Sequence, residues 1–314
     1  MTSRRGFLRG GALTAAGLAA GIGTASGQGS AASRRGTPTF VFIPGSHGSG
    51  TYLAPLTAEL TIRGHRAFTV DPPGHGAEAV IPSWYCAPQD AAAMASAPSP
   101  IAHITLADAV NRAVRAVVRA AANGPVILVA HSLGGATAGM VGNAVPALIS
   151  RIVYVSAYCP VTLGTVAEYS LAPENSGSAL NDPSLIAAPT TVGALRVNWR
   201  SGEPVFLEKL RSAYLQDGTI DQLRSMVSGL QPDETLRFST DTARVDGHSW
   251  GRIRRTYVRA TEDRAMPTAL QDRMIREADA LTPRNRFDVH SLPLSHLGLT
   301  IDPAPLATLL ASLT

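Results

Sequence analysis

The sequence has few cysteines, few charged residues and almost no lysine. Two cysteines among 314 residues exclude a fold that is held together by many disulfides. Charged residues make up 16% of the chain, and Lys209 is its single lysine. The net charge of +4 falls to +1 without the first 33 residues, which carry Arg4, Arg5 and Arg9 but no acidic residue. A nearly neutral body gives no electrostatic reason to expect nucleic acid as a partner.

Apolar residues, in contrast, are abundant. They make up 45% of the chain, which is enough to bury a core in one large domain or two ordinary ones. A composition of this kind is neither that of a disordered chain nor that of a fibrous protein.

The N-terminal residues have the pattern of an export signal. Arg4-Arg5 stands shortly before Phe7-Leu8, and no charged residue follows between Gly10 and Ser33. This stretch is too rich in glycine, and its apolar part too short, for a membrane span. The paired arginines predict a twin-arginine signal peptide over residues 1–32, with an approximate cleavage site. A disordered basic leader is the alternative. We expect a secreted or extracytoplasmic protein without stable membrane association after cleavage.

The rest of the chain alternates between strand patterns and helix patterns. Apolar runs that end at turn residues predict strands over 39–43, 66–70, 125–130, 151–156, 255–260 and 286–290. Apolar residues at helical spacing predict helices over 52–62, 106–122, 135–145, 267–280 and 303–313. This alternation predicts an α/β fold with a mostly parallel, doubly wound sheet of about six strands and helices on both faces.

The alternation breaks between residues 160 and 250. This part contains polar helical stretches over 208–216 and 220–230. We therefore expect a core formed by 37–159 and 251–314, and a helical lid insertion formed by 160–250.

A serine stands where the clearest strand gives way to a helix. Ser132 lies in Ala130-His131-Ser132-Leu133-Gly134, with a small residue two positions before it and two after it. Small residues at these positions permit the tight turn from which a nucleophilic serine projects. The start of the following helix favours developing negative charge beside it. An ordinary helix-capping serine is the alternative. The predicted strand before Ser132 and the predicted helix after it favour a nucleophile.

From residue 38 to the C-terminus, the sequence resembles the α/β-hydrolase family. Besides the serine motif, the resemblance includes Asp71-Pro72-Pro73-Gly74-His75-Gly76 after the second predicted strand. Within this family, the sequence is most similar to the small-esterase branch that includes plant methylesterases and hydroxynitrile lyases. That branch lacks the first two antiparallel strands, and here too the first strand leads directly into Pro44-Gly45-Ser46-His47-Gly48. The branch usually has His-Gly where this chain has Pro44-Gly45.

The resemblance implies partners for Ser132 in the order nucleophile, acid, histidine. Asp263 follows the next-to-last predicted strand and matches the position of the acid, with Glu262 as its competitor. His296 lies in the loop before the final helix and matches the position of the base. His290 is the alternative base, although it still belongs to the end of the last strand.

The resemblance also implies an oxyanion hole. Its donors are the backbone N–H groups of Ser46 and Leu133.

His47 lines the entrance of the site or is a solvated loop residue. The histidines show no spacing that would hold zinc, so we expect neither a metal nor a cofactor.

The two cysteines follow different predicted strands on the carboxyl side of the sheet. In an exported protein, a disulfide between Cys86 and Cys159 is favoured over two separate thiols.

The resulting hypothesis is a secreted serine hydrolase that cleaves a small-molecule ester or lactone. A hydroxynitrile-lyase type of lyase is the first alternative. That part of the branch has a lysine after the catalytic histidine and a threonine in the oxyanion loop, whereas this chain has Leu297 and Gly45. Dehalogenases and epoxide hydrolases would need an aspartate at position 132. A non-catalytic small-molecule-binding protein is the second alternative. The fold alone does not distinguish these functions, whereas the residues of the site do.

Overall fold

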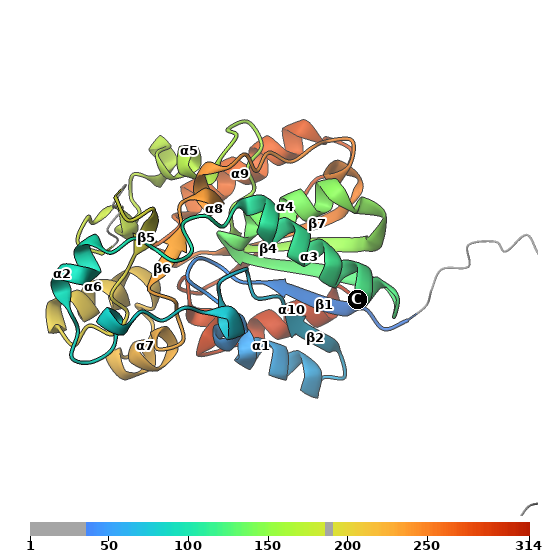
Figure 1. Ribbon diagram of the computed structural model, residues 1–314. Helices are drawn as coiled ribbons and strands as arrows, with labels where there is room; N and C mark the ends of the chain where they lie inside the picture. Colours follow the sequence, from blue (N-terminus) through green and yellow to red (C-terminus); the bar gives the residue numbers. More distant parts are fainter. Residues whose placement is uncertain (1–35, 186–190) are drawn as a thin grey trace, which may run out of the picture. The chain divides into compact units, whose positions relative to one another are not determined.

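The computed structural model describes residues 36–185 and 191–314 (Figure 1). The predicted signal peptide, residues 1–32, lies outside these residues and stays a prediction. The described residues form one compact unit. No helix within the described ranges is long and apolar enough to cross a membrane.

Six parallel strands form the central sheet, in the order β2-β1-β3-β4-β7-β8. Their bounds are β1 Thr39–Ile43, β2 Arg66–Thr69, β3 Val126–Ser132, β4 Ile149–Ala157, β7 Arg254–Ala260 and β8 Asp288–Leu292. The inner strands are almost wholly buried, whereas the edge strands β2 and β8 are half-exposed. Continuous apolar runs are expected where a parallel sheet is covered on both faces. The predicted α/β fold with about six strands is therefore confirmed.

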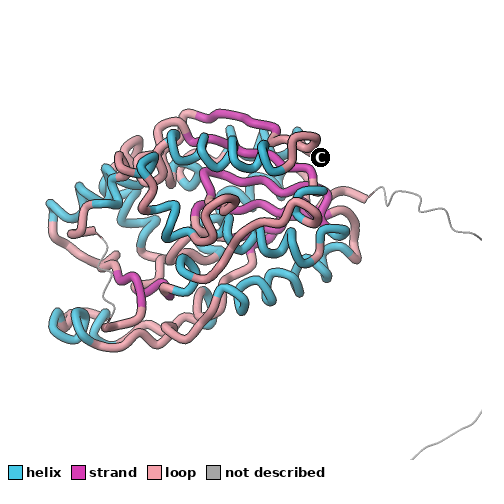
Figure 2. The backbone as a smooth tube through the Cα atoms, turned by 90° about the horizontal axis from the view of Figure 1, so that it is seen from above, coloured by secondary structure: helices cyan, strands magenta, loops and turns pink. Residues whose placement is uncertain are grey.

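Helices cover both faces of this sheet (Figures 1 and 2). Side chains of α1 and α10 share one apolar core with the sheet, and those of α3, α4 and α9 share another. Strand β1 contributes side chains to both cores, because successive side chains of a strand point to opposite faces of the sheet. Phe40 and Phe42 lie in the first core, and Val41 and Ile43 lie in the second. The helices are α1 Gly50–Ile62, α2 Ala91–Ser96, α3 Leu106–Ala121, α4 Gly134–Ala144, α9 Thr268–Leu281 and α10 Ala304–Ser312.

The residues between β4 and β7, numbers 158–253, form what we call the insertion. Its helices are α5 Val166–Ser170, α6 Pro204–Tyr214, α7 Ile220–Val227 and α8 Arg237–Thr240. It also contains a two-stranded antiparallel sheet of β5 Ala194–Arg196 and β6 Asp233–Thr235. The sequence predicts only helices here, because strands of three residues are too short to show a period. A buried ion pair joins the two strands, with Arg196 Nε and Nη2 donating to the Asp233 carboxylate at 2.6 and 2.7 Å.

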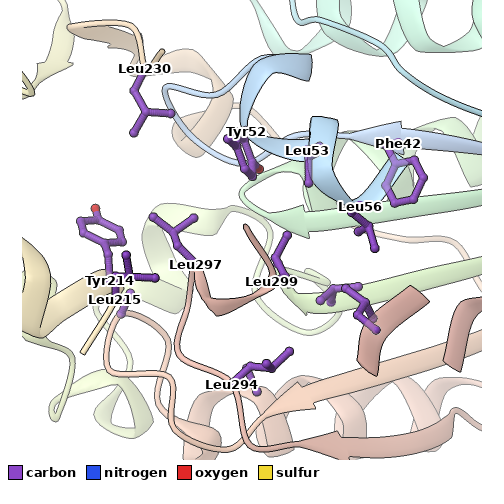
Figure 3. Close-up of a cluster of buried hydrophobic side chains, with 14 of the residues drawn as sticks. Phe42, Tyr52, Leu53, Leu56, Tyr214, Leu215, Leu230, Leu294, Leu297 and Leu299 are labelled. Carbon is purple, nitrogen blue, oxygen red and sulfur yellow. The ribbon is translucent and has the colours of Figure 1, made fainter. Parts of the chain in front are cut away.

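The insertion shares an apolar core with the sheet. Figure 3 shows Tyr214 and Leu215, at the end of α6, close to Leu297 and across from Tyr52 of α1. All of these residues belong to one buried cluster. The insertion is thus held by apolar packing as well as by polar contacts.

The expected disulfide is wrong, because both cysteines are free thiols. Cys159 lies two residues after the end of the inner strand β4 and is buried in the core that α9 covers. Its backbone N–H lies 3.2 Å from Met274 Sδ. Cys86 lies on the loop after the edge strand β2 and is exposed. Sequence order places both residues after strand ends, but it does not show that one side chain points into the core.

The two thiols should therefore differ in reactivity. Burial raises the pKa of the Cys159 thiol to about 12, and only the thiolate reacts rapidly. We expect a maleimide to add once to the folded protein, at Cys86, and twice after unfolding without reductant. Mass spectrometry counts the adducts. If the unfolded, unreduced chain carried no adduct at all, the two cysteines would instead be joined in a disulfide.

Candidate active site

Ser132 ends β3 in a strained turn. Its φ of +53° lies in the left-handed region, which residues with a Cβ rarely adopt. Helix α4 begins two residues later at Gly134, where an added Cβ would collide with the carbonyl oxygen of Pro44. The small residue that the motif predicted after the serine is thus required by close backbone approach.

Three predicted residues meet around this turn. His296 Nε2 lies 3.0 Å from Ser132 Oγ, and His296 Nδ1 lies 2.6 Å from Asp263 Oδ2. The side chains of His296 and Asp263 are buried. Because a carboxylate only accepts hydrogen bonds, Nδ1 carries the proton and donates it. The lone pair of Nε2 is then left to accept from the serine hydroxyl.

The two competing residues lie elsewhere. Glu262 is exposed beside Asp263, and its backbone pairs with the loop after β8. His290 lies within the edge strand β8, with Nε2 3.2 Å from Asp288 Oδ1. Neither side chain reaches Ser132 or His296.

Two backbone donors lie beside the serine without an acceptor. Among the described residues, the N–H groups of Ser46 and Leu133 have no hydrogen-bond partner. Both residues line the same cavity as Ser132. A Cβ at Gly45 would lie 2.8 Å from Ser132 Cβ, so glycine is what allows the loop after β1 to approach the serine. Unpaired N–H groups in this position can bind an oxyanion.

A buried Tyr52–His131 pair joins the two loops of the site, and sequence reasoning did not identify it. The Gly45 N–H donates to Tyr52 Oη, which lies 3.0 Å from His131 Nδ1. On the other side, His131 Nε2 donates to the carbonyl oxygen of His296 at 2.9 Å. Burial holds the His131 pKa well below its usual value, so this imidazole stays neutral. The pair fixes the loop after β1 relative to the His296 loop.

The insertion also anchors the His296 loop. The carbonyl oxygen of Tyr214 accepts the Leu297 N–H at 2.8 Å. Asp217 Oδ1 accepts the Ser295 hydroxyl at 2.6 Å. The residues on both sides of His296 are thus held by the last residue of α6 and by the segment that follows it.

Glu234, on β6 of the insertion, is buried between two histidines of the core. Its Oε2 accepts the His47 N–H at 2.8 Å and lies 3.4 Å from His75 Nε2. Burial opposes the charged form of His75, but the facing Glu234 carboxylate outweighs it and raises the His75 pKa. Burial likewise opposes ionised Glu234, but His75 and His47 outweigh it and lower the Glu234 pKa.

His47 differs from its neighbour in this cluster. Burial is the largest effect on His47 and lowers its pKa. Its Nδ1 lies 2.9 Å from the carbonyl oxygen of Gln231, so the proton of the neutral ring is on Nδ1. The backbone φ of His47 is +59°. This residue is buried beside Trp199 and lines the cavity, so it is not the solvated loop residue that the sequence left open.

A cavity of about 490 Å³ opens next to Ser132. Its lining includes apolar side chains of the insertion, such as Leu195, Trp199 and Leu230, and neutral polar ones such as Asn175. No aspartate, glutamate, lysine or arginine is among the described residues that line it. Nor does any group of three or more histidine, cysteine or acidic residues in the described ranges have the arrangement of a metal site.

The comparisons with known proteins agree with this architecture. Residues 40–309 match the profile of the family described as "Alpha/beta hydrolase family". No curated protein matches the sequence significantly.

Several solved structures share the fold. A pyrethroid hydrolase from Sphingobium faniae has a TM-score of 0.66 and 21% identity, over 88% of this chain and 96% of that chain. An extracellular alpha/beta-hydrolase from a Paenibacillus species has a TM-score of 0.62 and 19% identity, over 88% and 98%. Polyneuridine aldehyde esterase has a TM-score of 0.65 and 16% identity, over 88% and 99%. At such identities the likeness shows the fold alone.

The Glu234 cluster should make stability depend on pH. A raised His75 pKa stabilises the fold below pH 6.5, and this contribution is lost as the pH rises through the folded-state value. The lowered Glu234 pKa stabilises it above pH 4.5, and this contribution is lost in more acidic solution. The ion pair between Glu234 and His75 therefore contributes most to stability between pH 4.5 and pH 6.5.

We expect Glu234→Gln to lower the free energy of unfolding by about 1–3 kcal/mol near pH 5.5, the cost of an unpaired buried polar group. The loss should shrink as the pH rises through the raised His75 pKa, because His75 is then neutral in both proteins. Urea unfolding at several pH values measures it, with the exposed Glu262→Gln as control. A loss that stayed constant with pH would contradict the ion pair.

Proposed function

Because this chain belongs to the alpha/beta hydrolase family, we propose that it is a serine hydrolase of carboxylic esters, lactones included. Ser132 is the nucleophile, His296 the base and Asp263 the acid. The observation that carries the proposal is the continuous path from Asp263 through His296 to Ser132, at 2.6 and 3.0 Å. This path ends beside the N–H groups of Ser46 and Leu133, which have no acceptor among the residues that the structure describes.

The reaction follows from these positions. His296 Nε2 takes the hydroxyl proton while Ser132 Oγ bonds to the ester carbonyl carbon. The carbonyl oxygen becomes an oxyanion, which the N–H groups of Ser46 and Leu133 stabilise. When the carbonyl re-forms, the bond to the alcohol oxygen breaks and the alcohol leaves with the proton from His296. A water molecule, deprotonated by the same imidazole, then bonds to the acyl carbon. The bond from this carbon to Ser132 Oγ breaks, Oγ takes the proton back from His296, and the acid is released.

Cyanohydrin cleavage of the hydroxynitrile-lyase type is the weaker alternative. A threonine in the oxyanion loop would stand at Gly45, where a Cβ would lie 2.8 Å from Ser132 Cβ. The residue after His296 is Leu297, which is buried and has no charge. A non-catalytic binding protein would not need the strained Ser132 backbone, which costs about 1–3 kcal/mol.

The substrate proposed for this site is an uncharged ester with a sizeable apolar part. The described residues that line the cavity include no aspartate, glutamate, lysine or arginine that could pair with a buried ion, and burying an unpaired charge is costly. Its volume of about 490 Å³ lies within the range of small-molecule sites.

Export through the twin-arginine pathway belongs to the same proposal. It is supported by Arg4-Arg5 and the uncharged stretch that follows. N-terminal sequencing of protein recovered outside the producing cells tests it, and an uncleaved Met1 would contradict it.

We expect Ser132→Ala and His296→Ala each to lower kcat on a nitrophenyl ester by at least about 10³-fold, since nucleophile and base act as one unit. Because only the neutral imidazole accepts the serine proton, wild-type kcat/KM should fall as the solution is made acidic, which gives the pH profile an acid limb. A serine-reactive phosphonate should label Ser132 once. His290→Ala serves as the control and should stay near wild type. Activity that survives Ser132→Ala would overturn the assignment.

The cavity also predicts a preference that can be measured with a matched pair of substrates. Nitrophenyl pentanoate and the nitrophenyl monoester of glutarate differ chiefly in a terminal carboxylate. We expect kcat/KM for the uncharged ester to be higher by about 100-fold or more, the cost of burying an unpaired charge. Leu171→Arg should narrow the difference, because Leu171 lines the cavity yet is 87% exposed, so an arginine fits there. Equal rates for both esters would contradict the uncharged cavity.

A further inference from the structure

Strand β4 contains one extra residue opposite the serine turn. His131 of β3 pairs with Val155, but Ser132 pairs with Ala157, so Ser156 has no partner in the ladder. Its φ of +37° lies in the left-handed region. Bulges are uncommon between parallel strands, and they re-aim a side chain. Here the re-aimed side chain is that of Ser156.

The hydroxyl of Ser156 donates to Asp263. The distance from Ser156 Oγ to Asp263 Oδ2 is 2.6 Å, and Ser156 is only 1% exposed. The same Oδ2 accepts His296 Nδ1–H at 2.6 Å. The other oxygen, Oδ1, accepts the backbone N–H groups of Ala265 and Met266 at 2.8 and 2.7 Å. The carboxylate therefore has two donors on each oxygen, and only one of the four is the histidine.

We propose that Ser156 is a positioning residue for the triad that the proposed function requires, and the inference rests on that function. Its hydroxyl holds the plane of the Asp263 carboxylate, so that Oδ2 faces His296. It also takes up part of the negative charge on Oδ2. The left-handed backbone of Ser156 supports this role, because strained backbone conformations occur chiefly at functional sites.

Loss of this hydroxyl should affect the chemical step and leave substrate binding alone. Ser156 is not among the described residues that line the cavity. We expect Ser156→Ala to lower kcat by about 10- to 100-fold, the effect of one hydrogen bond to a charged group, with little change in KM. With more negative charge left on Oδ2, the protonated imidazole is favoured. The acid limb of kcat/KM should therefore move to higher pH.

A second variant separates this role from a structural one. Glycine fits a positive φ without cost and also lacks the hydroxyl. Ser156→Gly should therefore fold with a Tm no lower than that of Ser156→Ala, yet show the same loss of kcat and the same displaced limb. A residue needed only for folding would give lower Tm values without displacing the limb.

The chain offers a matched control on the same strand. Ser150 is the extra residue of a second irregularity between β3 and β4, and its hydroxyl donates to the Val126 carbonyl oxygen at 2.8 Å. It lies at the other end of β4 from the site. Ser150→Ala should leave kcat and the pH profile unchanged.

A double-mutant cycle with Asp263→Asn completes the test. If Ser156 acts through Asp263, adding Ser156→Gly to Asp263→Asn should change kcat by no more than about twofold. Independent, multiplying losses would overturn the inference, and so would Ser156 variants with wild-type kcat and pH profile. A wild-type protein without Ser132-dependent ester turnover overturns the proposed function, and the inference with it. An active wild type beside unaffected Ser156 variants overturns the inference alone.

Discussion

The left-handed backbone of Ser132 is the constraint on which the rest of the site depends. A positive φ at this residue lifts its hydroxyl out of the sheet at the carboxyl end of β3. Such a turn requires that neighbouring chain segments come unusually close, which is why Gly45 and Gly134 stand where a Cβ would collide. The loop after β1 can then bring its N–H groups to the serine. The strained turn, the two glycines and the unpaired donors are parts of a single arrangement.

The insertion completes this arrangement as well as covering it. Tyr214 and Asp217 hold the residues on either side of His296, and Glu234 holds the N–H of His47 in the loop after β1. Apolar packing of α6 against the core fixes the insertion itself (Figure 3). The geometry of the site therefore depends on residues that are far from the three central ones in sequence.

Much of the fold could be predicted because it is written in local patterns. A buried parallel strand is a continuous apolar run, and a helix that packs on the sheet has apolar residues at helical spacing. The serine turn has a local signature too, whereas Asp263 and His296 were identified from family resemblance and loop position. Contacts such as Tyr52–His131 and His47–Glu234 join residues 79 and 187 positions apart, and no local pattern records them. The disulfide hypothesis failed for the same reason, since loop order does not tell which way Cys159 points. The bulge at Ser156 leaves no mark in composition or period.

The neutral lining of the cavity bears on how a reaction there would end. Ester hydrolysis converts an uncharged molecule into a carboxylate and an alcohol. No arginine or lysine among the described lining residues can pair with that carboxylate, and water solvates an anion far better than an apolar wall does. In the reaction proposed above, the acid product would therefore be solvated better by water than by the surface that binds its ester. The absence of charged side chains among the described lining residues, which favours entry of an uncharged ester, would also favour release of the acid, and accumulated acid would compete poorly for the site.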